Sequence, residues 1–430
     1  MPANRLKPAS APSRLARTLG TRDAVLIGLG SMIGAGVFAA IGPAAAAAGT
    51  GLLLGLLAAA AIAYCNAMSS AQLAALYPES GGAYVYGNRR LGRFWGFLAG
   101  WGFVVGKVAS CAAMALTFGY YAAPQFAQPL AAGAVVALTA VNYRGIQGTA
   151  KVTRIIVAVV LAALATIIVA ALFGGQADTG RIWPLEVTSA YGVLQAAGLL
   201  FFAFAGYARI ATLGEEVIEP EKTIPRAIPI ALVITLIVYA AVAISALLAV
   251  DVSDLAGSAA PLVLAVSNGE LSSLSPVVRI GATVASLGVL LSLLAGVGRT
   301  AFSMASNKDL PGFLGAVHPR HKVPHRAEVA VGALVVGIVL IADVRGAIGF
   351  SSFAVLTYYG VTNAAALTLD PGERSYSRFF AIVGLAGCAV LAFSLPLASV
   401  ISGTAVLAVG ALLYRFARQY QRESKSTPQK

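Results

Sequence analysis

The stretch Ile27-Gly-Leu-Gly-Ser-Met-Ile-Gly-Ala-Gly-Val-Phe38 decides how this chain folds. It lies inside an apolar run, residues 24–48, that is long enough to cross a bilayer. Each glycine inside a helix costs roughly 0.5–1 kcal/mol relative to alanine, so the glycines of this stretch predict a break in the helix. Irregular backbone persists at membrane depth only where protein buries it or where it lines a cavity. We therefore predict a spanning helix that is broken to form a binding site.

The composition is that of an integral membrane protein. Of the 430 residues, 58% are hydrophobic and only 11% are charged, against about 25% charged in soluble domains. A formal net charge of +13 would suggest nucleic acid binding in a soluble protein, but here the basic residues are expected in cytoplasmic loops. No nucleic acid partner, metal or cofactor is expected. The three cysteines fall in apolar segments and are interpreted as core residues.

Twelve apolar runs predict an all-α protein with twelve transmembrane helices and membrane lipid as its surroundings. The runs cover residues 24–48, 52–73, 94–118, 129–141, 152–173, 191–213, 227–250, 276–302, 327–342, 347–369, 379–395 and 397–416. With the amino terminus inside, 26 of the 30 basic residues fall on cytoplasmic segments or at the cytoplasmic ends of spans. This charge asymmetry predicts a multi-pass protein of the plasma (inner) membrane with both termini cytoplasmic. Residues 1–22 and 419–430 are expected to be polar cytoplasmic tails.

The sixth run repeats the pattern of the first. In Gly198-Leu-Leu-Phe-Phe-Ala-Phe-Ala-Gly206-Tyr-Ala-Arg209, small and aromatic residues lie in the middle of the span and a charge follows. Transporters built from inverted repeats place broken helices at corresponding positions of their two halves. Helices 1 and 6 correspond if each half has five helices. We therefore predict repeat one at residues 23–174, repeat two at 189–370, and two accessory C-terminal helices at 378–417, within a single domain at 23–418.

Two broken helices of opposite direction suit a zwitterionic ligand. The second half of helix 1 begins near Gly34, where free N–H groups at Ala35, Gly36 and the next residue favour a carboxylate. The first half of helix 6 ends near residues 202–205, where unpaired carbonyl groups favour an ammonium. The alternative is that these glycines only allow helices to pack closely. The presence of two matched breaks favours the binding site.

Four motifs resemble those of the amino acid–polyamine–organocation transporters. Gly30-Ser-Met-Ile-Gly-Ala-Gly-Val-Phe38 resembles their first-helix signature, and Phe201-Phe-Ala-Phe-Ala-Gly-Tyr207, followed by the loop from Glu215 to Arg226, resembles their sixth helix and its exit. Residues 78–86 (PESGGAYVY) resemble their loop between spans two and three, and residues 298–311 their eighth-helix exit. Together these motifs run in order from about residue 23 to 330.

The resemblance implies the five-plus-five inverted-repeat (LeuT-type) fold and secondary transport of amino acids or related amines by alternating access. It implies Gly34, Ala35 and Gly36 at the substrate carboxylate, and the carbonyls of Met32, Phe202 and Ala205 at the amino group. Phe202 would cover the substrate, and Tyr207 would add apolar surface. The lysine that some proton-coupled relatives carry in the fifth helix is missing here, because residues 155–163 are aliphatic.

Two charges within predicted spans are therefore candidates for coupling transport to an ion. Lys107 lies in the third span, where it serves as a proton carrier, as a counter-charge at the substrate, or as a structural residue. Arg209 follows the sixth-helix break; a guanidinium stays charged, so it serves as a fixed cation, binds a substrate side chain, or pairs with Glu215 or Glu216. Proton coupling is expected.

The loop after helix 6 is expected to form ion pairs at a cytoplasmic gate, or else to be a solvated loop; the gate candidates are Glu215, Glu216, Lys222 and Arg226. Tyr84 and Tyr86 are interpreted as interfacial anchors. The three histidines, His318, His321 and His325, are expected in one cytoplasmic loop rather than at a metal.

The predicted function is uptake of amino acids, with neutral ones favoured because the two breaks contain no acidic residue. An exchanger or a non-transporting amino acid sensor remains an alternative. A channel would need continuous polar stripes along its spans, and a membrane enzyme would need paired carboxylates, a zinc motif or a nucleophile with a base. Neither pattern is present in the sequence.

Overall fold

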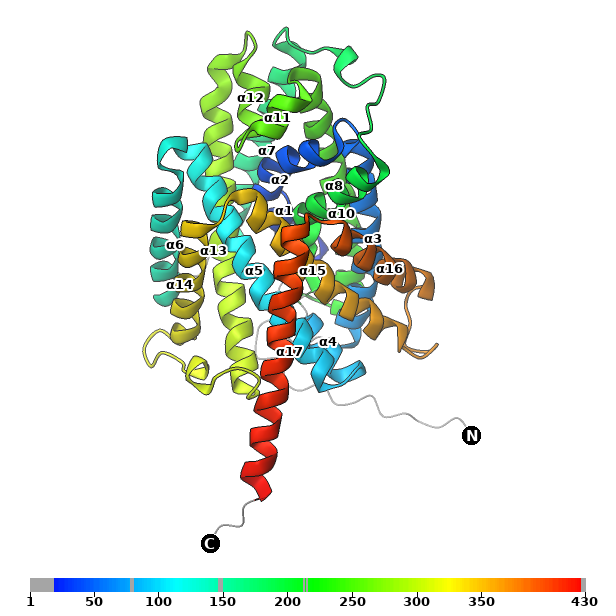
Figure 1. Cartoon of the computed structure of the whole chain (residues 1–430), viewed down its shortest axis with the longest axis vertical. Helices are drawn as coiled ribbons and strands as arrows, with labels where there is room; N and C mark the ends of the chain where they lie inside the picture. Colours follow the sequence, from blue (N-terminus) through cyan, green and yellow to red (C-terminus); the bar gives the residue numbers. More distant parts are fainter. Residues whose placement is uncertain (1–18, 78–80, 146–149, 212, 214–215, 427–430) are drawn as a thin grey trace.

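The computed structural model describes residues 19–426 except 78–80, 146–149, 212 and 214–215, and its architecture is helical (Figure 1). Each predicted span corresponds to a helix or to a pair of helices. These are α1 (Thr21–Met32) with α2 (Ala35–Ala48), α3 (Leu52–Leu76), α5 (Arg93–Ala122), α6 (Ala127–Tyr143), α7 (Ala150–Phe173), α8 (Ala190–Phe204) with α9 (Ala208–Ala211), α10 (Pro220–Ala249), α13 (Ser275–Ser306), α14 (His325–Ile341), α15 (Val344–Leu367), α16 (Arg378–Ser394) and α17 (Leu397–Ser426).

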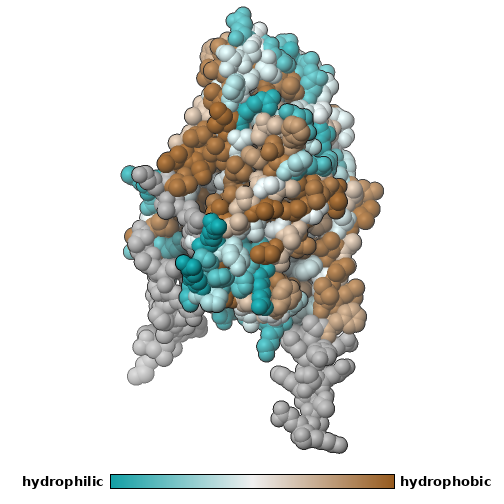
Figure 2. All heavy atoms as spheres, turned by 90° about the vertical axis from the view of Figure 1, so that its left-hand side faces the viewer, coloured by the Kyte–Doolittle hydropathy of each residue, from teal (hydrophilic) through white to brown (hydrophobic). Residues whose placement is uncertain are grey.

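Among the described residues, eight helices are long and apolar enough to cross a membrane, and counting the bent pair α1–α2 as one span gives up to nine. The other three predicted spans are α14 and α16, each of 17 residues, and α15, whose buried face carries polar side chains. In a space-filling view, hydrophobic residues dominate the middle of one side, and hydrophilic residues gather toward the two ends (Figure 2). This distribution suits a protein that is surrounded by lipid at its waist.

Several predicted boundaries were wrong. The seventh helix, α10, begins at Pro220 rather than near residue 227, so half of the predicted loop at 215–226 is helical. Proline at the first helical position loses no hydrogen bond, and this explains the early start. The loop after α3 contains a further helix, α4 (Ala83–Arg90), and the connection between α10 and α13 contains α11 (Val252–Gly257) and α12 (Pro261–Ser267).

The centre of the molecule is α5, which packs against α15 and α13. Within the most apolar 18-residue stretch of α5, 83% is buried inside the protein. This share is higher than for any other candidate span among the described residues. Small residues make this burial possible, because a Cβ at Gly106 would come within 2.7 Å of Ala354 on α15. The broken helices lie beside this core, with α1 packed on α10 and α2 packed on α8.

Candidate functional site

The first broken helix interrupts its hydrogen bonding at Ile33 and Gly34. The helices on the two sides of the break are inclined by 47°. Gly34 is the residue before the first turn of α2, and no side chain caps this helix end. The N–H groups of Ala35, Gly36 and Val37 are the first of a helix and therefore have no acceptor within it. The structure thus places a helix start with unpaired intrahelical donors at these residues, and their binding of a carboxylate stays a prediction.

The second break is milder than predicted. Helix α8 ends at Phe204 and continues as one 3₁₀ turn, η3 (Ala205–Tyr207), before the single turn of α9. A 3₁₀ turn tightens the backbone and changes which carbonyls are bonded, but it does not open the chain as a bend does. Helix 6 is therefore interrupted at the predicted residues, by a change of helix type rather than by an unwound segment.

The two breaks touch each other through glycine. A Cβ at Gly36 would lie 2.7 Å from the Cα of Ala203, and a Cβ at Gly206 would lie 2.3 Å from the carbonyl oxygen of Ser31. Contacts below 3.0 Å force the backbone to move, so only glycine permits this approach. Close packing, the alternative explanation for these glycines, is thus observed, and it brings donors and carbonyls of the two helices together.

Tyr239 of α10 links the two breaks, and the sequence analysis missed it. Its hydroxyl lies within hydrogen-bonding distance of the carbonyl oxygen of Met32 and 3.1 Å from that of Ala203. The carbonyl of Met32 also accepts from the N–H of Gly34 at 2.7 Å. The carbonyl predicted for the substrate ammonium is therefore already bonded in this structure. The only signal in the sequence was a tyrosine in an otherwise aliphatic run.

Tyr359 of α15 contacts the sixth-helix break. The hydroxyl of Tyr359 lies 3.4 Å from the carbonyl oxygen of Ala205, and its ring stacks on Tyr207 with centroids 5.1 Å apart. Tyr207 and Phe202 are both buried, with exposed fractions of 0% and 8%. Of the three predicted carbonyl sites, those of Met32 and Ala205 thus face a tyrosine hydroxyl. Whether these carbonyls and Phe202 meet a substrate stays a prediction.

Comparison with known proteins decides the family. A family profile described as amino acid permease matches residues 23–422, which is nearly the whole chain and includes both breaks. The chain belongs to the amino acid permease family. It is a membrane transporter of amino acids, and the predicted relationship to the amino acid–polyamine–organocation superfamily is confirmed.

Curated relatives extend over the same length. An uncharacterized transporter of Mycobacterium tuberculosis (strain ATCC 25618 / H37Rv) is 60% identical over 98% of this chain and 96% of its own. The branched-chain amino acid permease BcaP of Bacillus subtilis (strain 168) is 27% identical over 94% of both chains. The human cationic amino acid transporter 4 is 28% identical over 83% of this chain and 60% of its own. The names of the last two relatives specify substrates that differ in charge.

The two charged residues predicted inside the permease have different surroundings. Lys107 is buried on α5 with 7% of its surface exposed, and it forms no ion pair with the carboxylates of the described residues. Arg209 on α9 lies 3.9 Å from Glu216, the pairing that was considered as a structural alternative. That either residue couples transport to an ion stays a prediction.

The predicted gate residues do not form one network in the described part of the loop. Lys222 in the first turn of α10 pairs at 3.0 Å with Glu219, the residue before the helix, and Glu216 pairs with Arg209. Arg226 is exposed, and Glu215 lies outside the described residues. Sequence reasoning missed two links at this end: the N–H of Leu19 donates to the carbonyl of Glu216 at 3.1 Å, and Arg154 pairs with Asp23 at 2.9 Å.

The loop tyrosines are buried rather than interfacial. Tyr84 and Tyr86 of α4 have exposed fractions of 6% and 2%, and the hydroxyl of Tyr84 donates to Asp309 at 2.7 Å. Burial, and then the hydrogen bond and charge of Asp309, raise the pKa of Tyr84 to about 12. Tyr84 therefore fastens α4 to the segment after α13, and its interpretation as a membrane anchor was wrong.

The three histidines gather around one ring. The rings of His318, His321 and His325 lie 5.3, 6.3 and 5.8 Å from that of Tyr143. Two of them are loop residues, as predicted, but His325 begins α14. Burial, and then the charges of His318 and nearby arginines, lower the pKa of His321. The described residues contain no cluster suited to a metal ion.

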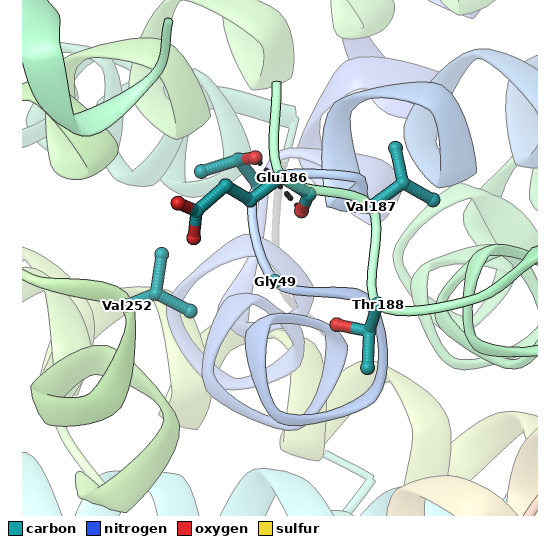
Figure 3. A pocket seen from close by; sticks show the side chains of 6 residues that line it. Gly49, Glu186, Val187, Thr188 and Val252 are labelled. Carbon is teal, nitrogen blue, oxygen red and sulfur yellow. Dashed lines mark hydrogen bonds between the residues drawn. The ribbon is translucent and has the colours of Figure 1, made fainter. Parts of the chain in front are cut away.

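One small pocket lies far from the breaks, near the other end of α2 (Figure 3). Its volume is about 270 Å³, and Gly49, Thr50, Glu186, Val187, Thr188 and Val252 line it. Helix α2 has 14 residues, so this pocket is roughly 20 Å along the helix from the break at Gly34. Its walls are held by a hydrogen bond from Thr50 to the carbonyl of Glu186. It is therefore separate from the candidate substrate site.

Proposed function

We propose that this permease takes up neutral amino acids across the plasma membrane by proton-coupled alternating access. The observation that carries the proposal is the contact between the two broken helices. Free N–H groups at Ala35 and Gly36 lie on a helix that packs against Ala203, whose carbonyl faces the same tyrosine as Met32. The positive end of α2 suits a carboxylate, and the carbonyls suit an ammonium. Such a site recognises the part that all amino acids share.

The preference for neutral side chains rests on charge. Residues 27–38 and 198–208, which contain the breaks, carry no ionisable acid that would pair with a cationic side chain. The name of BcaP, a branched-chain amino acid permease, agrees with this preference, whereas the name of cationic amino acid transporter 4 does not. Arg209 lies one residue beyond the second break, so an anionic substrate is the next class to test.

The test is transport by the purified, reconstituted protein. We expect labelled leucine to accumulate in vesicles under an inward proton gradient without sodium, and a thermal-shift screen of the twenty amino acids to favour neutral ones. Uptake that depends on sodium and ignores pH would refute the coupling. Exchange of internal for external leucine without net accumulation would identify an exchanger, and binding without any flux would identify a sensor.

The repeats at 23–174 and 189–370 and the orientation of the chain belong to the same proposal. The inverted-repeat arrangement is supported by the positions of the two interrupted helices, first and sixth in order. Cytoplasmic termini are supported by the basic residues at that end of the spans. In such a fold one bundle rocks against the rest around the fixed site, which alternately opens it to either side.

A further inference from the structure

A buried carboxyl group lies in the first turn of α14, away from the helix breaks. Glu328 has an exposed fraction of 4%, and its Oε2 atom is buried without a hydrogen-bond partner. Its Oε1 atom lies 2.7 Å from the position that a Cβ would take at Gly298 of α13. Glycine at this position leaves the room that the carboxyl group occupies. The carboxyl group of Glu328 therefore fits closely against α13, while one of its oxygen atoms lacks a hydrogen bond.

Among the described residues around Glu328, Arg299 is the cation in electrostatic range of its carboxyl group. Helix α13 contributes Arg299, which is in electrostatic range of the carboxyl but forms no ion pair with it. Helix α5 contributes Cys111, with Lys107 beyond it. Helix α6 contributes no charge among its residues 127–143, and η5 (Gly312–Gly315) contributes none. On α14 itself, His325 and Arg326 are the charged or titratable neighbours in the first turn.

A carboxylate in such a place needs a proton or a closer cation. Burying an unpaired charge costs several kcal/mol, and an ionisable residue within a membrane span is by default functional. Two states satisfy Glu328: a neutral acid with Arg299 at its present place, or a carboxylate paired with Arg299 after a movement. Exchanging these two states binds or releases one proton.

The charges around Arg299 connect this site to the sixth-helix break. Arg299 is also in electrostatic range of Arg209, and Arg209 pairs with Glu216 just after the break. A rearrangement of the break that moved Arg209 would change the repulsion between the two arginines and so the position that Arg299 prefers. A substrate that binds at the breaks thus has a physical route to Glu328, although it does not touch it.

The proton also has a route to the loop. His325 lies one helical turn before Glu328, and its Nδ1 atom is buried without a partner. Residues three apart on a helix lie side by side. His325 is thus placed on the same face of α14 as Glu328, as a candidate acceptor for a proton that leaves the carboxyl group, and its ring packs against Tyr143 and the loop residue His318.

We propose that Glu328 carries the coupling proton, which it binds while Arg299 is apart from it and releases when Arg299 pairs with it. Neither Lys107 nor Arg209 is then required to titrate, and Arg209 serves to position Arg299. The proposal rests on the proposed proton-coupled function and names the residue that performs it.

The test compares two activities of the reconstituted full chain. Leucine counterflow needs substrate binding and the alternation of access, whereas accumulation also needs the proton. With the membrane potential held at zero, a gradient of one pH unit drives about tenfold accumulation at one proton per substrate. We expect wild type to approach this ratio, and Glu328→Gln to equilibrate leucine at about onefold while it still catalyses counterflow. Glu328→Asp should regain accumulation with a shifted pH profile, and Glu270→Gln, an exposed control, should behave as wild type.

The outcomes separate this proposal from the one on which it rests. Tenfold accumulation by Glu328→Gln with the pH profile of wild type would overturn the role of Glu328 and leave proton coupling intact. Loss of counterflow and of the leucine-induced thermal shift in both Gln and Asp variants would overturn it in favour of a structural role. If wild type itself shows counterflow without accumulation, the proton coupling fails and Glu328 has no proton to carry. If wild type shows neither activity, the proposed transport function fails.

Discussion

At the scale of single residues, hydrogen bonds to the interrupted backbone hold the candidate site. Tyr239 carries one hydroxyl hydrogen and faces two carbonyl oxygens, those of Met32 and Ala203, on opposite sides of the contact between the breaks. One donor cannot serve both carbonyls fully, so the pair is left with spare acceptor capacity. Because the carbonyl of Met32 also accepts from the N–H of Gly34, we predict that a substrate ammonium would bond chiefly to the carbonyl of Ala203.

Tyr239→Phe tests this arrangement. Removing the hydroxyl leaves a buried carbonyl without its donor, which costs about 1–3 kcal/mol, and loosens the contact between the breaks. We expect a lower melting temperature and a KM for leucine that rises by roughly tenfold, the equivalent of 1.4 kcal/mol. Uptake kinetics in vesicles and thermal unfolding in detergent measure the two effects.

A matched control is Tyr121→Phe. Its hydroxyl also donates to a carbonyl of α2, that of Phe38, at 2.9 Å, but it does not reach α8. We expect this variant to lose stability and to keep the KM of wild type. Equal KM values for all three proteins would show that Tyr239 has no part in substrate binding.

At the scale of elements, the sequence predicted which helices are interrupted better than it predicted how they are interrupted. The glycines of residues 27–38 identified a break because each one lowers helix stability locally. The sequence contained no local signal for the partner that fills the space above Gly36, because Ala203 lies 167 positions away and only tertiary packing brings it there. For the same reason Tyr239 and Glu328 were missed: their role depends on what faces them.

The predicted helix boundaries were wrong where a helix extends beyond the apolar region. Helix α10 contains Pro225 and Pro229 and begins with a charged turn, so hydropathy placed its start seven residues too late. The prolines lie in the first three turns, where fewer backbone hydrogen bonds are lost than at the centre of a helix. Helix α4 was missed because its eight residues include two arginines and an asparagine and have no apolar run long enough to cross a membrane.

The contact between α2 and α8 gives a prediction about packing. Gly36→Ala places a methyl group 2.7 Å from the backbone of Ala203, so the helices must separate. We expect a loss of about 1–3 kcal/mol in stability, the usual cost of overpacking, and a loss of leucine binding. Ala203→Gly removes one methyl group from the same contact, but the clash is with the Cα atom, so the double variant should recover only part of the stability.

The control for Gly36→Ala is Gly133→Ala in α6, where a Cβ meets nothing within 4 Å. This change should raise stability by about 0.5–1 kcal/mol, because alanine favours the helix. Thermal unfolding of the purified variants and of wild type measures these differences in stability. Equal stabilities of Gly36→Ala and wild type would show that the helices do not meet at this residue.

A second prediction concerns the ion pair that fastens α4. The Nη2 atom of Arg90 lies 2.5 Å from the Oε2 atom of Glu373 in the loop before α16. The backbone N–H of Asp370, and then Arg90, lower the pKa of Glu373 below its ordinary value of 4.5. The depressed pKa means that this carboxylate stabilises the fold above pH 4.5 and that the contribution is lost as the pH falls through the folded-state pKa.

Glu373→Gln should therefore melt slightly below wild type at neutral pH and together with it in acid. A partly exposed ion pair contributes about 0–1 kcal/mol, so the shift should be small and should shrink in high salt. Melting temperatures measured across a pH series test this, with Arg90→Gln as the complementary change. A difference that persists unchanged at the acid end would show that Glu373 acts through packing rather than charge.

At the scale of the whole molecule, charge and apolar surface together determine how the permease lies in the membrane. The loop before α14, which contains His318 and His321, and the end of α17 lie at the same end of the molecule in Figure 1. The segment with Asp251, Asp254 and Glu270 belongs to the connection between α10 and α13, at the opposite end. Basic residues concentrate at the first end, which predicts that it faces the cytoplasm.

Cysteine labelling tests this orientation in intact cells. The native cysteines, Cys65, Cys111 and Cys388, are buried, so an impermeant maleimide should leave them largely unlabelled. We expect Glu270→Cys to react in intact cells and Lys308→Cys to react only after the membrane is opened, since both positions are exposed. The reverse pattern would invert the topology, and with it the direction in which a proton leaving Glu328 through His325 is released. Labelling of both variants from outside would contradict the predicted number of membrane crossings between the two positions.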